Sequence, residues 1–245
     1  MTEIDAPALI PQEHVLLHEL NHRINNEFAA AIGVVTVAAA RSSNDEAKAA
    51  LTGVAELLHR YADVHRLLQM PDCDTLVDAA VYLRQLCLSI SRSTLDASEI
   101  SLVLSAQSLR LQAERCWRLG MIVHELISNA ARHAFENRGG AIRVAVWQDG
   151  AFVKCSVLDS GSVTTSIAPG HGLKIVNSLS RALGGRFGQT FGVQGSKSLL
   201  VFPYDSEPMV SGERPLQGQV QNPERDAQAF GEGPSLAPGS EPLVI

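Results

Sequence analysis

The chain has 245 residues, of which 45% are hydrophobic, and it carries a formal net charge of −6. An acidic chain is a poor partner for nucleic acid or for an anionic membrane surface, so we expect neither. No apolar run approaches the ~20 residues of a membrane-spanning helix, and the first residues lack the basic and apolar segments of a secretion signal. The four cysteines are scattered and form no C-x-x-C pair, which indicates reduced thiols in a cytoplasmic protein.

Two long helices are predicted after a flexible lead at residues 1–12. In residues 14–41 the apolar residues recur at three- and four-residue steps, as they do on one face of a helix. Asn44 has the character of an N-cap, and a second helix with its own apolar stripe continues to Met70, before Pro71. The first stripe consists of Leu17, Leu20, Ile24, Phe28, Ala31 and Val35.

These two helices carry more apolar surface than a single hairpin can bury. Each is about 40 Å long at about 1.5 Å per residue. Two hairpins that pair into a four-helix bundle cover both stripes. We therefore expect a homodimer formed through residues 13–71.

Residues 72–205 alternate between helix and strand patterns. Helices are predicted at 75–91, 113–135 and 171–183, and strands at 100–104, 109–111, 142–147, 152–158, 186–190 and 198–202. The predicted fold class is therefore α+β: an N-terminal helical hairpin followed by a two-layer α/β sandwich. From residue 206 onward Pro, Gly, Gln and Glu dominate, and we expect a disordered tail at 206–245.

The first predicted helix contains an H-E-x-x-H sequence formed by His18, Glu19 and His22. Two histidines one turn apart with a glutamate between them are the signature of zinc metalloproteases. Catalytic zinc needs a third protein ligand, and neither the residues after His22 nor the second helix offers one in the usual pattern. A zinc protease is therefore a distant alternative. On the helix, His22 projects away from the apolar stripe, one turn from both Glu19 and Asn26.

A second group of polar residues lies in the helix predicted at 113–135. Glu125, Asn129 and His133 are four residues apart and share one face. A carboxylate beside an amide supplies oxygen ligands that suit Mg²⁺, and a histidine one turn further on reaches phosphate oxygens. An ordinary amphipathic helix with a polar face has the same pattern, so this segment alone is not specific.

Two glycine motifs follow in the chain. Asp159 and Gly161 come directly after a predicted strand, and Gly170 and Gly172 directly precede a predicted helix. An aspartate followed by a glycine suits a base that approaches the backbone, and free N–H groups at a helix start suit a phosphate. Each motif is weak alone, because Asp-Ser-Gly is also a common turn and glycine often precedes helices.

Taken in this order, these segments resemble sensor histidine kinases of the HisKA_2/HWE-like branch of two-component signalling, over about residues 14–203. The first match is His-Arg-x-x-Asn at 22–26. The others are the N-box H-E-L-I-S-N-A-A-R-H-A-F at 124–135, V-L-D-S-G at 157–161 and G-H-G-L-K-I-V at 170–176. Four matches in the family's order are far more specific than any one of them.

The resemblance implies a dimerisation and phosphotransfer hairpin at 13–71 and a Bergerat (GHKL-type) ATP-binding domain at 72–205. In it, His22 is the phosphoacceptor and Asn129 binds Mg²⁺. Our hypothesis is that Glu19 orients the imidazole and that Asn26 positions water or a phosphoryl group. The residues implied to bind ATP are Glu125, Asn129, His133, Asp159, Gly161, Gly170 and Gly172.

The implied partner is a response-regulator receiver domain, whose aspartate takes the phosphoryl group from His22; whether a separate sensor protein docks on the chain stays open. One departure from the family pattern is Val163, which replaces the second glycine of the D-x-G-x-G motif. An alternative function is therefore a histidine phosphotransferase with a degenerate ATP site that relays phosphoryl groups between receiver domains. The kinase is favoured because the other site residues are all present.

Overall fold

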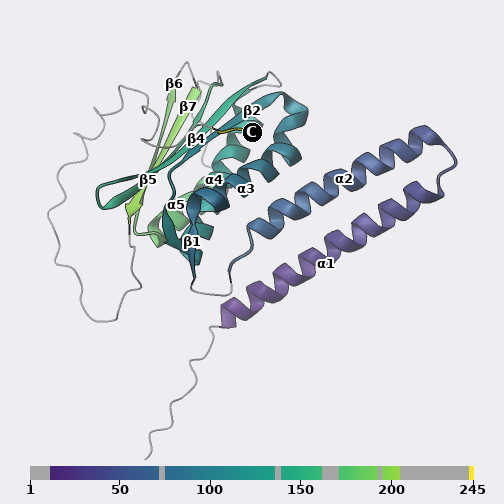
Figure 1. Ribbon diagram of the computed structural model, residues 1–245, viewed down its shortest axis with the longest axis horizontal. Helices are drawn as coiled ribbons and strands as arrows, with labels where there is room; N and C mark the ends of the chain where they lie inside the picture. Colours follow the sequence, from purple (N-terminus) through teal and green to yellow (C-terminus); the bar gives the residue numbers. More distant parts are fainter. Residues whose placement is uncertain (1–11, 72–74, 136–138, 162–170, 193–194, 205–242) are drawn as a thin grey trace, which may run out of the picture.

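The computed structural model describes residues 12–71, 75–135, 139–161, 171–192, 195–204 and 243–245. The chain begins with two long helices that form an antiparallel hairpin, α1 (Gln12–Arg41) and α2 (Asp45–Leu67) (Figure 1). Asn44 caps α2 as predicted, because its Oδ1 accepts a hydrogen bond from the Ala47 amide at 3.0 Å. Inside the hairpin the rings of Phe28 and His65 are 5.9 Å apart.

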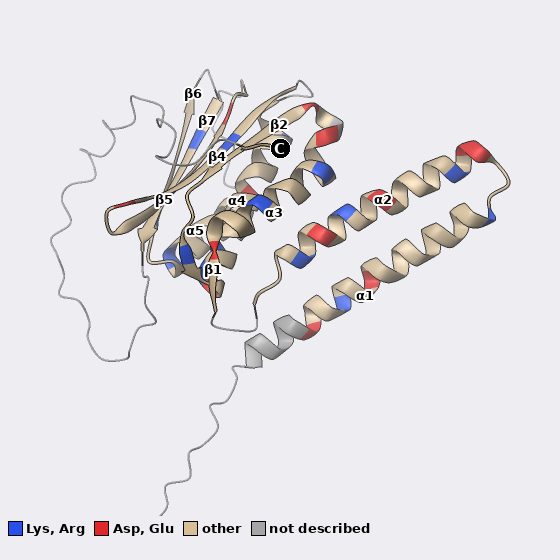
Figure 2. Ribbon diagram, in the orientation of Figure 1, with Lys and Arg blue, Asp and Glu red and all other residues tan. Residues whose placement is uncertain are grey.

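The hairpin leaves much apolar surface uncovered. In α1, Ile24, Phe28 and Val35 of the predicted stripe are half-buried, whereas Leu20 and Ala31 are exposed. No charged residue lies between Glu27 and Arg41, and Figure 2 shows this uncharged length of α1. The large apolar side chains that remain exposed on the two helices are Leu20, Val34, Val37, Val54, Leu57 and Tyr61.

The rest of the chain forms a two-layer unit of helices packed on a sheet (Figure 1). The sheet has the strand order β6-β7-β5-β4-β2-β8, and β2 and β4 are parallel while the other neighbours are antiparallel. Its strands are β2 (Ile100–Ala106), β4 (Gly140–Asp149), β5 (Phe152–Asp159), β6 (Arg186–Gly192), β7 (Gly195–Pro203) and β8 (Leu243–Val244). The helices are α3 (Ala79–Ile90), α4 (Ala113–His133) and α5 (His171–Ala182), and a π-helical turn η1 (Ser91–Leu95) and a 3₁₀ turn η2 (Asp96–Ser98) follow α3.

The predicted α+β class and the two-layer sandwich are confirmed, with two corrections. The helix predicted at 75–91 begins only at Ala79, because Leu76–Asp78 form a short strand, β1, that pairs with β3 (Arg110–Gln112). The Asp78 carboxylate then caps α3 by accepting from the amides of Ala80 and Val81. The second correction concerns the tail expected to be disordered, since Leu243–Val244 form β8 beside β2; residues 205–242 lie outside the described part.

The sandwich has one core between its sheet and its helices. Fully buried side chains come from α3, α4 and the inward faces of β2, β4, β5 and β7. Cys87, Cys116 and Cys155 are free and buried there, and burial raises the pKa of each thiol to about 12. No disulfide joins these three described cysteines, and Cys73 lies outside the described residues. Of the helices described, none is long and apolar enough to cross a membrane.

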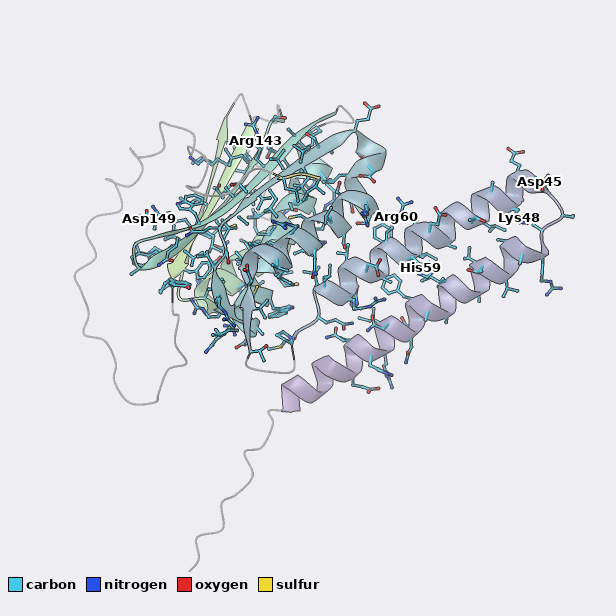
Figure 3. All side chains as sticks on the ribbon, viewed as in Figure 1. Asp45, Lys48, His59, Arg60, Arg143 and Asp149 are labelled. Carbon is cyan, nitrogen blue, oxygen red and sulfur yellow. The ribbon has the colours of Figure 1, made fainter. Side chains whose placement is uncertain are left out.

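The hairpin is joined to the sandwich through the C-terminal half of α2. The Tyr82 hydroxyl donates to the Leu67 carbonyl at 2.9 Å, and the Trp117 indole N–H donates to the Leu68 carbonyl at 2.8 Å. These donors satisfy carbonyls that a helix end leaves without partners, and α2 ends here, three residues before the predicted Met70. Nearer the middle of α2, the Arg60 guanidinium reaches the Arg92 carbonyl of η1 at 2.9 Å; Figure 3 labels Arg60.

Candidate nucleotide-binding pocket and phosphoacceptor helix

An open cavity lies between α4, α5 and the strands β5, β6 and β7. It encloses about 810 Å³ of empty space, part of it open to solvent. The polar side chains that line it are Asn129, His133, Asp159, Gln189, Ser196 and Ser198. Its apolar lining includes Leu126, Val157, Leu173 and Phe191. A lining of mixed polarity suits a ligand with a flat apolar part and a polar part.

Helix α4 presents the predicted polar face to this cavity. Its opposite face is buried in the core through Leu119, Ile122 and Ile127, so the register of the helix is fixed by packing. Asn129 is half-buried and His133 is exposed at the cavity. The structure therefore brings two of the three predicted α4 residues directly into the cavity lining.

Glu125 lies one turn further back, against the first turn of α5. A Cβ built on Gly172 would be 1.9 Å from Glu125 Oε1, so only a glycine leaves room for this carboxylate. The side chain is thus held where α5 begins, and free backbone N–H groups of a helix start attract negative charge. Gly170 and Val163 lie outside the described residues.

Arg132 is a charged residue of this site that the sequence analysis did not single out. Its Nη2 is 3.1 Å from Asn129 Oδ1 and 3.6 Å from Glu125 Oε1. The guanidinium therefore contacts the same amide and carboxylate oxygens that were expected to serve Mg²⁺. The sequence does contain a signal for Arg132: a residue three positions after Asn129 lies on the same helix face as Asn129.

Asp159 ends β5 and is buried at the bottom of the cavity. Its Oδ1 accepts from the Gly161 amide at 3.0 Å and from the Ser196 amide at 3.2 Å, and its Oδ2 accepts from the Ser196 hydroxyl. Ser196 was also missed by the sequence analysis, since it is on β7 and only sheet pairing brings it near. These donors fix the carboxylate in one orientation.

Gly161 is required by the close approach of two segments. A Cβ on this residue would be 2.2 Å from the Ala134 carbonyl oxygen, at the end of α4. The backbone after Asp159 therefore passes directly against α4. This contact holds the Asp159 end of β5 against the C-terminal end of α4.

The residues present fit Mg-ATP. The fixed Asp159 carboxylate is an acceptor for an amino group on a flat base, and Phe191 and Val157 offer apolar surface beside it. At the other side, Asn129 and Glu125 supply oxygen atoms of the kind that Mg²⁺ prefers. Arg132, beside Asn129 and Glu125, and His133, in the cavity lining, are groups that would suit phosphate oxygens.

His22 lies apart from this cavity, on α1. Its side chain is exposed, and its Nδ1 is 3.2 Å from the amide nitrogen of Asn26. Glu19 does not contact the imidazole, because its carboxylate accepts from Arg23 Nε at 3.1 Å. The structure therefore brings Asn26 to His22 but brings neither Glu19 nor the cavity residues to it.

The zinc interpretation finds no support in this geometry. The side chain of His18 lies outside the described part of the chain. Among the side chains that are described, no three of His, Cys, Asp or Glu come together as a metal site. Glu19, the expected base, is instead paired with Arg23.

The fold and this site define a histidine kinase, and comparison with known families gives the same class. A family described as "Histidine kinase" (HisKA_2) matches residues 19–94, and one described as "Histidine kinase-like ATPase domain" (HATPase_c_2) matches residues 95–186. The two adjoin and together span more than half of the chain. The chain belongs to the histidine kinases of the HisKA_2 type.

Individual relatives agree with this membership. The chain is 28% identical over 151 residues to the sensor histidine kinase PdtaS of Mycolicibacterium smegmatis, a match that covers 59% of this chain and 29% of that protein. The chain thus spans less than a third of the length of this relative.

Among solved structures, the histidine kinase domain of a blue-light activated histidine kinase from Erythrobacter litoralis superposes with a TM-score of 0.53. It is 19% identical, and the match covers 73% of this chain and 96% of that one. A longer structure of the same kinase gives a TM-score of 0.50 at 20% identity, covering 63% of this chain and 59% of that one. At these identities the likeness shows the fold alone.

Proposed function

We propose that this chain is a two-component histidine kinase that phosphorylates its own His22 from Mg-ATP and passes the phosphoryl group to an aspartate of a response-regulator receiver domain. The observation that carries the proposal is the cavity itself. One wall holds the Asp159 carboxylate, which three hydrogen-bond donors fix in place. The other wall holds the oxygen atoms of Asn129 and Glu125 beside the Arg132 guanidinium. An exposed histidine on a separate hairpin is then the acceptor.

Positioning and charge neutralisation account for most of the rate in phosphoryl transfer. When bound, Mg²⁺ would neutralise phosphate charge. Asn129 would hold the ion, Glu125 would lie beside it, and Arg132 would turn from these two oxygens to the phosphate. Asp159 would bind the base at the other side of the cavity. Together these residues would match the distance between the base and the phosphates of ATP.

His22 would act as the nucleophile in its neutral form, because only an unprotonated ring nitrogen carries a lone pair for attack. Asn26 contacts Nδ1, so Nε2 is the ring nitrogen that faces solvent. The orientation of an asparagine amide is an assignment, and a half-turn of the Asn26 amide places its oxygen on a protonated Nδ1. That arrangement leaves the Nε2 lone pair free for attack.

Because the pocket and His22 are apart, the ATP-binding domain at 72–205 must move relative to the hairpin at 13–71 for transfer. We further propose that two hairpins associate through the uncovered apolar side chains of α1 and α2, forming the four-helix bundle of a homodimer. The receiver domain would bind this bundle near His22. A cytoplasmic location completes the proposal, and docking of a separate sensor protein stays a hypothesis.

The test is incubation of the purified protein with γ-labelled ATP and Mg²⁺, beside His22→Ala and Asn129→Ala variants. We expect label on the wild type and none on either variant, while His59→Ala, which removes an exposed histidine of α2, keeps the label. Absence of label on the wild type would overturn the proposal that the protein phosphorylates its own His22. If the wild type then accepts label from a phosphorylated receiver domain, the protein is a phosphotransferase.

A further inference from the structure

At one end of the sheet, β2 lies beside the short strand β8. Strand β2 is parallel to β4 from Ile100 to Ala106. On its other side, within the described residues, it pairs only with β8, through Val103↔Val244 and Leu104↔Leu243, and the Ile245 amide donates to the Leu102 carbonyl at 2.9 Å. Among the described residues, 243–245 are therefore the ones that cover this edge, opposite residues 102–104 of β2.

The sequence of β2 is not that of an edge strand. Exposed edges usually carry charged residues, proline or bulges, which prevent pairing with another strand. β2 reads I-S-L-V-L-S-A and contains none of these, whereas β6, at the opposite edge, begins with Arg186 and contains Gly188 and Gly192. β2 thus has the composition of an interior strand that requires a neighbour.

The segment 243–245 is held by few contacts. Leu243 is 37% exposed and Val244 is 72% exposed, so their side chains contribute little packing. Ile245 is the anchor, because its side chain packs against the core cluster while its amide bonds to β2. One anchoring side chain and two exposed ones leave this segment weakly held on β2.

We propose that the edge of β2 is a binding site for an extended apolar peptide strand, and that residues 243–245 occupy it as a tethered, exchangeable ligand. Recognition would come from backbone hydrogen bonds to β2 and from one β-branched side chain in the place of Ile245. The site is remote in the sheet from the nucleotide cavity, which involves β5, β6 and β7. The proposal does not depend on the kinase function.

A labelled peptide with the sequence of residues 239–245 tests the proposal by fluorescence anisotropy. In the wild type the tethered segment competes with the peptide at a high effective concentration. We therefore expect the Ile245→Asp chain to bind the peptide at least about ten times more tightly than the wild type. Val244→Asp is the matched control, since it adds the same charge at an exposed position, and it should bind as the wild type does.

A chain that ends at residue 240 frees the same edge without introducing a charge near the core. We expect it to bind the peptide, and to bind no peptide in which aspartate replaces the final isoleucine. Hydrogen exchange at the Leu102 and Leu104 amides should be faster in the free shortened chain and should slow again when the peptide is added. Failure of the peptide to bind the shortened chain, or equal affinity for the wild type and the shortened chain, would overturn the proposal.

Discussion

Ser196 donates to the carboxylate of Asp159 through both its hydroxyl and its backbone amide. The pairing between β5 and β7 brings these two residues together from positions far apart in the chain. Gly195 makes the approach feasible, because its φ of +115° and its contact with the Asp159 carbonyl exclude a side chain. The orientation of the Asp159 carboxylate, which we propose binds the base, is therefore set by β7 as well as by the D-x-G motif.

Replacing Ser196 by alanine should weaken ATP binding by about tenfold, because one donor to a carboxylate is worth about 1–2 kcal/mol. Titration calorimetry with ATP measures the loss. Ser101→Ala removes a serine hydroxyl that bonds to the Gly140 carbonyl away from the cavity and should leave the affinity unchanged. Equal affinities of Ser196→Ala and wild type would show that the carboxylate is held without this hydroxyl.

Gly172→Ala should impair Mg-ATP binding with little effect on stability. The added Cβ would displace Glu125 Oε1, which is the end of a flexible side chain and can swing away at small cost. The carboxylate would then leave its place beside Asn129 and the start of α5. We expect at least about a tenfold loss of affinity in Mg²⁺ and a smaller loss in EDTA. Gly188→Ala, which has open space around it on β6, is the control.

Gly161→Ala should instead lower the stability of the protein, with little effect on Mg-ATP binding. Here the added Cβ meets the Ala134 backbone carbonyl, which cannot move without shifting the end of α4. We expect a decrease of about 1–3 kcal/mol in the free energy of unfolding, the usual cost of overpacking. Urea denaturation measures it, and an unchanged midpoint would mean that β5 and α4 separate easily at this point.

On α1 the geometry favours Asn26 over Glu19 as the residue that orients His22, the proposed phosphoacceptor. Asn26→Ala should slow autophosphorylation by about tenfold or more, since the imidazole loses the one side-chain contact described for it. Glu19→Gln removes the charge of a residue paired with Arg23 and should change the rate by less than about twofold. A rate that falls more in Glu19→Gln than in Asn26→Ala would restore Glu19 to the mechanism.

Stability should fall in mild acid, partly through His124. Burial lowers the pKa of this histidine; the neighbouring Glu125 raises it and Arg132 lowers it further. In the unfolded chain the pKa returns to about 6.5, so the unfolded state binds more protons as the pH falls. The stability that neutral His124 contributes is therefore present above about pH 6.5 and is lost below it.

The His124→Gln variant should lose less stability than the wild type between pH 7.5 and pH 5.5. Chemical denaturation at the two pH values measures the difference. Burial also lowers the pKa of His65, so part of the acid effect should remain in the variant. His59→Gln, at an exposed position, should behave as the wild type. An identical pH dependence of stability in all three chains would show that His124 does not cause the loss of stability in acid.

The sequence predicted most of the elements because their signals are local. Asn44 and the residues after it form a cap within one turn, and the polar face of α4 follows from a fixed spacing. Contacts that depend on register between distant segments were not predictable in this way. Ser196 reaches Asp159 only through β-sheet pairing, and β1 is too short for a strand pattern.

The end of α2 and the pairing of β8 have the same explanation. Tyr82 and Trp117 end the helix through hydrogen bonds from other elements, and nothing near Leu67 in the sequence marks the stop. The segment 243–245 becomes a strand because β2 offers a free edge, while the composition around it is that of a disordered tail. In both places tertiary contacts override the local pattern.

The hydrogen bonds from Tyr82 and Trp117 to the carbonyls at the end of α2 also fix the rotation of this helix about its own axis. Each residue of an α-helix turns the chain by about 100° and advances it by about 1.5 Å. With the end of α2 pinned to α3 and α4, the number of residues between this joint and the hairpin turn decides which way the turn and the whole of α1 point. One inserted residue in α2 would turn the hairpin by about 100° and place His22, the proposed phosphoacceptor, on a different side of the molecule. The length of α2 therefore sets the direction in which His22 faces.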